Sequence, residues 1–347
     1  MRYTRACIES FGYELAPVVV TSAELEARLE PVYRELHLQP GQLEALTGIE
    51  ERRWWEPGAS VADGAAAAAK KAVENAGVDP STIDAVIYAG VCRENFEPAT
   101  ACEVAAEVGV GTQAAVYDLS NACLGVMNGV VDLANRIELG QVRRGLVVAC
   151  ETAREINEVM IERMLQKPDM EFFRKALTTF TGGSAAVAVL VGDSSGEDRP
   201  RRRLRGGIQQ TAPQWHALCR WGLESDGNGK VVPFMNTDSV SVLKYGVELG
   251  VKTWRAFLER VGWAREQVDR IVCHQVGLGH QESIRRALGI PEERDFVTYR
   301  YLGNMGTVSL PLTAAMAEEQ GHLRPGHRVG LLGIGSGLNC MMIAVEW

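Results

Sequence analysis

The chain has 347 residues, of which 46% are hydrophobic and 23% charged, as in folded globular proteins too long for one simple core. Its net charge of −8 argues against general nucleic-acid binding, although an acidic small ligand needs only a local cationic site. The eight cysteines show no zinc-like or disulfide-framework spacing, so we predict free thiols, no bound metal and a cytoplasmic protein. No signal peptide is recognisable, and no apolar run reaches the roughly 18 residues of a membrane span.

Taken in chain order, predicted strands alternate with predicted helices. Apolar or β-branched runs predict strands at residues 5–15, 83–90, 114–119, 146–150, 185–191, 268–274 and 329–334. Helical spacing and capping residues predict helices at 21–36, 62–77, 100–108, 126–140, 155–175 and 238–262, and one ending near Gly321. We expect a loop at 46–55. The polar segment 193–203 predicts a solvated connection between halves, although its arginines and Arg205 are also a candidate cationic docking site.

The second part of the chain repeats the pattern of the first. When Gly140 is aligned with Gly321, Asn304 falls opposite Cys123, at the same strand-to-helix turn. We therefore predict two related halves, 1–195 and 204–347, in an α/β fold with helices between and outside the sheets. Halves related by a pseudo-twofold would bring the two turns together at the centre.

Cys123 lies where a short strand turns into a helix. Free N–H groups at a helix N-terminus favour negative charge, so we expect a lowered thiol pKa and a reactive nucleophile. The same N–H groups can hold the oxyanion that forms on an attacked thioester. The alternative is a buried, inert cysteine.

Two further polar residues stand at strand ends, His274 after Ile271–Cys273 and Asn304 in a glycine-rich turn. An imidazole can exchange protons or donate a hydrogen bond, and an amide can donate one, so both suit acyl transfer with Cys123. Each alone fits a structural histidine or a turn residue equally well.

The chain resembles the thiolase superfamily, in its β-ketoacyl-ACP synthase III branch, over essentially its whole length. The resemblance is carried by Ser120-Asn-Ala-Cys-Leu-Gly, Cys273-His-Gln, Gly303-Asn-Met-Gly-Thr-Val-Ser-Leu-Pro and Gly333-Ile-Gly-Ser-Gly-Leu-Asn-Cys. Within the branch it is most similar to enzymes that join two fatty acyl-CoAs head to head in bacterial olefin synthesis. The resemblance implies a duplicated five-layer αβαβα fold and a homodimer. It also implies that Cys123 is the acylated nucleophile, that His274 and Asn304 form one oxyanion site, and that the N–H groups of Cys123 and Ser336 form another.

Glu97 bears on the choice of reaction. Malonyl-using synthases usually carry an apolar residue before this proline, whereas condensing two plain acyl thioesters requires a base for the α-proton. Burial would raise a glutamate pKa towards neutrality, and by the resemblance Glu97 reaches the site of the partner subunit. The alternative is a surface glutamate favoured by a nearby helix N-terminus. Arg174 matches a family arginine at the CoA entrance, and Phe172 and Phe173 are either channel lining or plain core.

The sequence thus predicts an acyltransferase that condenses two fatty acyl-CoAs without decarboxylation, through an acyl-Cys123 intermediate, to a 2-alkyl-3-oxoacyl product. Coenzyme A thioesters are substrates, and no cofactor is expected. The main alternative is a synthase III that condenses an acyl-CoA with malonyl-ACP and releases CO2; acyl carrier protein thus stays open as a donor. A non-catalytic acyl-CoA-binding protein and a cysteine thioesterase are further alternatives.

Overall fold

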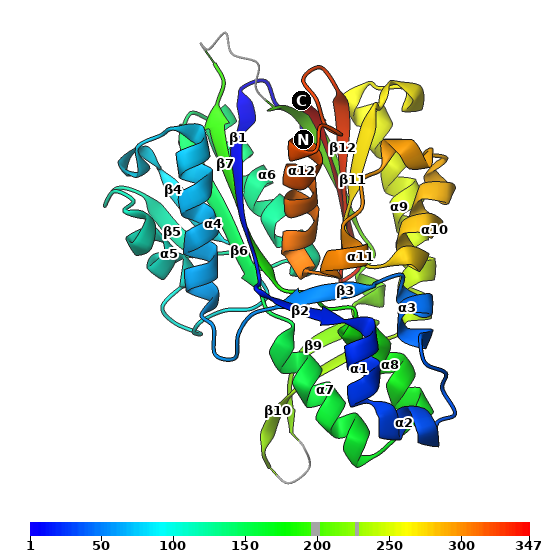
Figure 1. Ribbon diagram of the computed structural model, residues 1–347. Coiled ribbons are helices and arrows are strands. Elements are labelled where there is room, and N and C mark those ends of the chain that lie inside the picture. Colours follow the sequence, from blue (N-terminus) through cyan, green and yellow to red (C-terminus); the bar gives the residue numbers. More distant parts are fainter. Residues whose placement is uncertain (196–201, 226–228) are drawn as a thin grey trace.

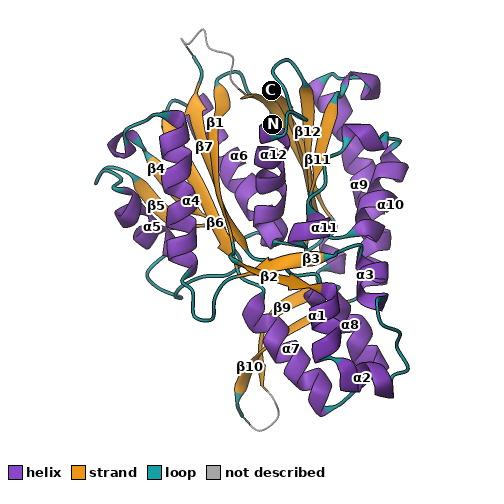
Figure 2. Ribbon diagram, in the orientation of Figure 1, coloured by secondary structure: helices purple, strands orange, loops and turns teal. Residues whose placement is uncertain are grey.

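The computed structural model describes residues 1–195, 202–225 and 229–347, and it places a long mixed sheet at the centre of the chain (Figure 1). The nine strands of this sheet follow the order β11-β12-β13-β8-β1-β7-β6-β4-β5. Figure 2 shows helices on both sides of each half of the sheet and a pair of helices between the halves. This is the thiolase-like α/β architecture that the sequence predicts.

The first half of the sheet contains most of the strands predicted from apolar runs. Its strands are β1 (Ala6–Leu15), β4 (Ala85–Tyr88), β5 (Ala115–Asp118), β6 (Arg144–Glu151) and β7 (Ala185–Asp193). β4 pairs in parallel with β5 and β6, whereas β7 runs antiparallel to both β6 and β1. Helices α4 (Val61–Ala76) and α5 (Thr100–Val108) cover its outer face (Figure 1).

The second half repeats the pairing pattern of β4, β6, β7 and β1. Its strands are β8 (Arg202–Thr211), β11 (Arg270–Cys273), β12 (Arg328–Gly335) and β13 (Asn339–Glu346). β11 pairs in parallel with β12, and β13 is antiparallel to both β12 and β8. A single parallel bridge from Ile271 to Asp295 stands where β5 pairs with β4 in the first half. Helices α9 (Ser239–Val261) and α10 (Leu278–Leu288) cover the outer face.

The inner layer consists of α6 (Gly125–Glu138) and α12 (Ser309–Glu319), which lie between the two halves (Figure 1). Their buried apolar residues form one continuous core with both halves of the sheet. The Val126 N–H donates to Thr307 Oγ1 at 2.8 Å, and these residues are 181 positions apart, the separation between Gly140 and Gly321. The turns before the two inner helices therefore meet at the centre of the molecule, as the repeat predicts.

A smaller region packs below the sheet, at the ends of the strands that carry the polar residues (Figure 1). It contains α1 (Ser22–Arg28), α2 (Glu30–Glu35), α3 (Gln42–Thr47), α7 (Arg154–Gln166), α8 (Met170–Phe180), the strand pair β2 (Val18–Thr21) and β3 (Glu51–Trp54), and the hairpin β9 (Cys219–Ser225) and β10 (Val231–Thr237). No helix of the described residues is long and apolar enough to cross a bilayer.

Several sequence-based boundaries are wrong, for identifiable local reasons. The helix predicted at 21–36 is two helices, because Pro31 at the start of α2 has no N–H to continue the hydrogen-bond ladder. The helix predicted at 155–175 is broken between α7 and α8, where Pro168 precedes Asp169, whose carboxylate caps α8. The loop predicted at 46–55 contains the end of α3 and all of β3.

The predicted connection at 193–203 lies partly outside the described residues, which resume at Arg202. Arg202 and Arg203 belong to β8, and Arg202 pairs with Glu318 and lies over the rings of Phe11 and Trp347. Arg202 is therefore part of the fold, and belongs neither to a solvated connection nor to a docking site.

Gly12 on β1 provides a test of the packing between sheet and helix. A Cβ atom there would lie 2.2 Å from the Ala68 carbonyl oxygen of α4, an approach that backbone atoms cannot relieve cheaply. We expect Gly12→Ala to lower the free energy of unfolding, measured in urea, by about 3 kcal/mol. Gly279→Ala on α10 is the control, because a Cβ atom there would meet no atom within 4 Å, and it should change stability by less than about 1 kcal/mol. Equal losses in both variants would contradict this account.

Candidate active site

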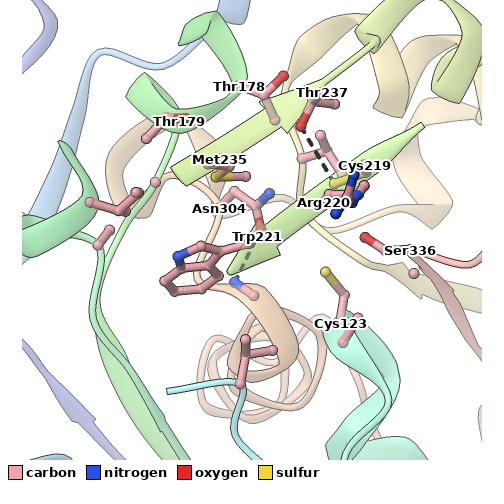
Figure 3. Close-up of a pocket in the computed structure, with 18 of the residues that line it drawn as sticks. Cys123, Thr178, Thr179, Cys219, Arg220, Trp221, Met235, Thr237, Asn304 and Ser336 are labelled. Carbon is pink, nitrogen blue, oxygen red and sulfur yellow. Dashed lines mark hydrogen bonds between the residues drawn. The ribbon is translucent and has the colours of Figure 1, made fainter. Parts of the chain in front are cut away.

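Cys123, His274, Asn304 and Ser336 line one cavity of about 570 Å³, where the two halves of the sheet meet the smaller region. In Figure 3 the Cys123 thiol points towards the β9–β10 hairpin, and Asn304 and Ser336 flank the same space. The structure thus brings together the three residues predicted from their matching strand-end positions. A cavity of this size fits an elongated small-molecule ligand.

The backbone around Cys123 is unusual. Cys123 lies in a short 3-10 turn, Ala122–Leu124, directly before α6, rather than in the first turn of the helix itself. Ala122 has a φ of 45°, a left-handed conformation that costs free energy for a residue with a side chain and is often found at functional sites. A Cβ atom on Gly335 would lie 3.5 Å from the Cys123 nitrogen, so the Gly335–Ser336 backbone passes beside that N–H. This proximity fits the predicted pairing of the Cys123 and Ser336 N–H groups.

The expected lowering of the thiol pKa is wrong. Burial raises the pKa of the Cys123 thiol to about 12, Cys219 and Glu151 act in the same direction, and the Cys123 N–H only partly opposes them. The helix-terminus effect is smaller here than the cost of partly desolvating a thiolate in the cavity wall. The resting site therefore holds a neutral thiol, which must lose its proton as it attacks.

His274 follows β11, and its ring is held in a buried environment. Its backbone N–H donates to the Leu332 carbonyl at 2.9 Å, and the neighbouring Gln275 side chain donates to Cys273 O and accepts from Thr298 N–H. Burial, with a smaller contribution from His280, lowers the pKa of His274 to about 4. The imidazole is therefore neutral at neutral pH and carries one N–H to donate.

The lowered His274 pKa predicts how stability depends on pH. Because the folded-state pKa lies below the ordinary value of 6.5, the unfolded chain binds the proton first as pH falls. Stability should therefore decrease as pH falls from about 6.5 to about 4, by about 3 kcal/mol from this residue. In urea unfolding at about pH 7 and about pH 4.5, His274→Gln should lose less stability on acidification than the parent chain. His216→Gln, at an exposed histidine, is the control. An unchanged pH dependence in His274→Gln would rule out this assignment.

Asn304 is held by its backbone and oriented by its side-chain oxygen. Its N–H donates to Thr181 O at 2.8 Å, and its carbonyl accepts from Gly183 N–H at 2.9 Å, which ties the turn to the end of α8. Its Oδ1 accepts from Gly306 N–H at 3.1 Å. Because that donor fixes the amide oxygen, the NH2 group is the part of the side chain left to donate into the cavity.

Glu97 and Arg174 do not line this cavity within one chain. Glu97 is exposed in the loop between β4 and α5, and the adjacent Phe96 is 98% exposed. The burial expected for Glu97 is thus not found in the single chain. Arg174 lies on the exposed side of α8, one turn before Thr178, which does line the cavity.

Phe172 and Phe173 are core residues rather than channel lining. Phe173 is buried and Phe172 packs against the same cluster, which joins α1, α2, α7 and α8. The alternative interpretation as plain core is therefore confirmed.

Sequence reasoning missed two parts of the cavity. Glu151, the last residue of β6, is buried in the cavity wall, and burial raises the pKa of its carboxyl group. The β9–β10 hairpin supplies Cys219, Arg220 and Trp221 (Figure 3). Glu151 could have been noticed as an acidic residue that directly follows the apolar run 146–150, at the end of a predicted strand. The hairpin could not, because its sequence lacks the alternation of apolar and polar residues that predicts strands. Among the described residues, no group of three or more His, Cys, Asp or Glu side chains is arranged to hold a metal.

Family comparisons agree with the fold and the cavity. Residues 56–177 match the thiolase N-terminal domain, and residues 258–347 match the 3-oxoacyl-[acyl-carrier-protein (ACP)] synthase III C-terminal domain. With the duplicated sheet and the enclosed cysteine, these matches define a thiolase-superfamily condensing enzyme, an acyltransferase. The acyl-CoA:acyl-CoA alkyltransferase of Shewanella oneidensis is 54% identical over 349 residues, covering 100% of both chains. The chain therefore belongs to the acyl-CoA:acyl-CoA alkyltransferase (OleA) family.

Solved structures of Xanthomonas campestris OleA superpose closely on this chain. The cerulenin-bound form gives a TM-score of 0.94 at 34% identity and covers 100% of this chain and 98% of that one. A cysteine-to-serine form with bound lauric acid and lauroyl-CoA gives 0.91 at 34% identity, covering 99% and 100%. Other structures of that enzyme carry replacements of a cysteine, a histidine or a glutamate.

Proposed function

We propose that this enzyme condenses two fatty acyl-CoA thioesters without decarboxylation, giving a 2-alkyl-3-oxoacyl-CoA. The observation that carries the proposal is the convergence of Cys123, His274 and Asn304 on one enclosed cavity. The activity of the Shewanella relative and the lauroyl-CoA bound to the Xanthomonas enzyme support these substrates.

In the first half-reaction the Cys123 sulfur attacks the thioester carbonyl of one acyl-CoA. The thiol proton leaves with the departing CoA thiol, and a new thioester forms on Cys123. The N–H groups of Cys123 and Ser336 donate to the carbonyl oxygen as it gains negative charge. The neighbouring Gly335 backbone, which leaves no side chain beside the Cys123 nitrogen, supports this arrangement.

In the second half-reaction another acyl-CoA loses an α-proton, and its carbonyl oxygen becomes an enolate oxygen. The Asn304 NH2 group and the neutral His274 N–H donate to that oxygen. The α-carbon attacks the acyl-Cys123 carbonyl, a C–C bond forms, and the Cys123 sulfur leaves and regains a proton. Two acyl-CoA molecules thus give one 2-alkyl-3-oxoacyl-CoA and one free CoA, and the proposed reaction requires no further cofactor.

We assign removal of the α-proton to the Glu97 carboxylate, which acts in the site of the other subunit of a homodimer. Glu97 stands on an exposed loop beside the almost fully exposed Phe96, a placement suited to insertion against a second copy. The exposed Arg220 at the cavity, with Arg174 one turn from its wall, suits the phosphates of CoA. A cytosolic enzyme is consistent with eight free cysteines.

Product analysis tests the proposal. The purified enzyme given a single long-chain acyl-CoA should form a condensed β-keto product or the ketone derived from it, detected by mass spectrometry. With malonyl-CoA labelled in its free carboxyl group, it should release no labelled CO2. Release of labelled CO2 with chain extension would instead favour the synthase III alternative.

A further inference from the structure

Glu151 is a buried carboxylate in the cavity wall that the proposed reaction does not use. It is 4% exposed and ends β6. Its Oε1 accepts from Val91 N–H at 2.9 Å, and its Oε2 accepts from Cys92 N–H at 3.1 Å. Both carboxylate oxygens are thus used to hold two successive backbone N–H groups.

These contacts connect Glu151 to the loop that carries Glu97. Val91 and Cys92 lie near the start of that loop, shortly after the end of β4 at Tyr88. Farther along the loop, the Glu94 carboxylate accepts from the Val61 N–H at 2.9 Å, at the start of α4. The loop is therefore fixed to β6 before Glu97 and to α4 only three residues from it.

Glu151 also touches the turn that carries Asn304. A Cβ atom on Gly306 would lie 3.3 Å from the Glu151 carboxyl carbon, so a glycine allows this contact. Gly306 in turn donates its N–H to Asn304 Oδ1. The Glu151 carboxylate therefore lies against both the loop that carries Glu97 and the turn that carries Asn304.

We propose that Glu151 is a positioning residue that sets the relative placement of the Glu97 loop and the Asn304 turn, and so is required for carbon–carbon bond formation but not for acylation of Cys123. This inference rests on the proposed function. A carboxylate is suited to the task because it accepts at both oxygens. A glutamine has one accepting oxygen, and its NH2 group would face a backbone N–H.

The test separates the half-reactions in Glu151→Gln. Acyl-Cys123 formation, followed by intact-protein mass spectrometry in a single turnover, should not fall more than about threefold below the parent. The Glu151 carboxylate hydrogen-bonds Val91 and Cys92, and loss of its charge would lower rather than raise the pKa of the Cys123 thiol. Condensation of the pre-acylated enzyme with a second acyl-CoA should fall about 100-fold, the cost of a small misplacement of reacting groups.

Glu26→Gln is the matched control, because Glu26 is also buried and accepts from the Gly41 and Leu43 N–H groups at 2.6 Å, in the α1–α3 region. Its half-reactions should be slowed equally or not at all. In a double-mutant cycle, the condensation rate of the Glu97→Gln, Glu151→Gln double variant should fall by less than the product of the fold-losses of the two single variants.

Normal condensation by Glu151→Gln, or equal losses in its two half-reactions, would overturn the inference. Normal condensation by Glu97→Gln with none by Glu151→Gln would also overturn it, in favour of direct proton removal by Glu151. Absence of condensation by the parent enzyme would refute the proposed function instead.

Discussion

Replacing Cys123 with alanine should abolish both acyl-enzyme formation and condensation. Without the sulfur no covalent thioester can form, so we expect the rate of product formation to fall by about 10⁴-fold or more. Intact-protein mass spectrometry after incubation with an acyl-CoA should show the mass of one acyl group on the parent chain and none on Cys123→Ala.

Cys219→Ala is the matched control for this prediction, since Cys219 lines the same cavity and accepts a hydrogen bond from Thr237 Oγ1 at 3.4 Å. It should still be acylated and still condense. Acylation of the Cys123→Ala chain at Cys219 would show that the nucleophile has been misassigned.

Replacing Glu97 should separate acylation from condensation, and mixing variants should show which subunit's site it serves. Glu97→Ala alone should form acyl-Cys123 but condense at least about 100-fold more slowly, because no carboxylate remains to take the α-proton. If Glu97 acts across a dimer, a mixed dimer of Glu97→Ala and Cys123→Ala chains contains one complete site. Because one of its two sites is complete, the isolated mixed dimer should then show roughly half of the parent activity.

The measurement is condensation by coexpressed chains carrying different affinity tags, purified through both tags in turn, compared with each variant alone. No restored activity in isolated mixed dimers would show that Glu97 does not act across the interface. Full condensation by Glu97→Ala alone would remove it as the base.

The sequence predicts the fold well because the two halves obey the same local rules. Apolar runs of strand length identify β4, β6, β7, β11 and β12, and the offset of 181 residues is reproduced by the Val126–Thr307 hydrogen bond. β8 escapes sequence reasoning because it contains Gly206 and Gly207, which have low strand propensity. The strand forms because it pairs with β13 in the folded chain. A glycine is required at Gly207, since a Cβ atom there would lie 2.3 Å from the Met342 carbonyl oxygen of β13.

In the site, too, some features follow from the local sequence and others depend on residues that only the fold brings together. Cys123 and His274 could be found because each follows a strand, and Asn304 because it stands 181 residues after Cys123 in the repeated frame. In the structure a short helix, α11 (Tyr299–Leu302), rather than a strand precedes Asn304. The direction of the Cys123 pKa shift could not, because it depends on burial in the folded chain and on the electrostatic influence of Cys219 and Glu151, which are distant in sequence. The role of Glu97 stays a prediction, as do the homodimer and the division of the chain at 195 and 204.

The central claim is that an acyl group on Cys123 is attacked by the α-carbon of a second acyl-CoA. The most direct measurement loads the enzyme with one acyl group, removes free CoA thioester, and adds a second acyl-CoA of different chain length in a single turnover. We predict a product whose mass joins both chains, with disappearance of the acyl-Cys123 mass and no release of CO2. Release of the first chain as free acid, or its condensation only when malonyl thioester is supplied, would contradict the claim.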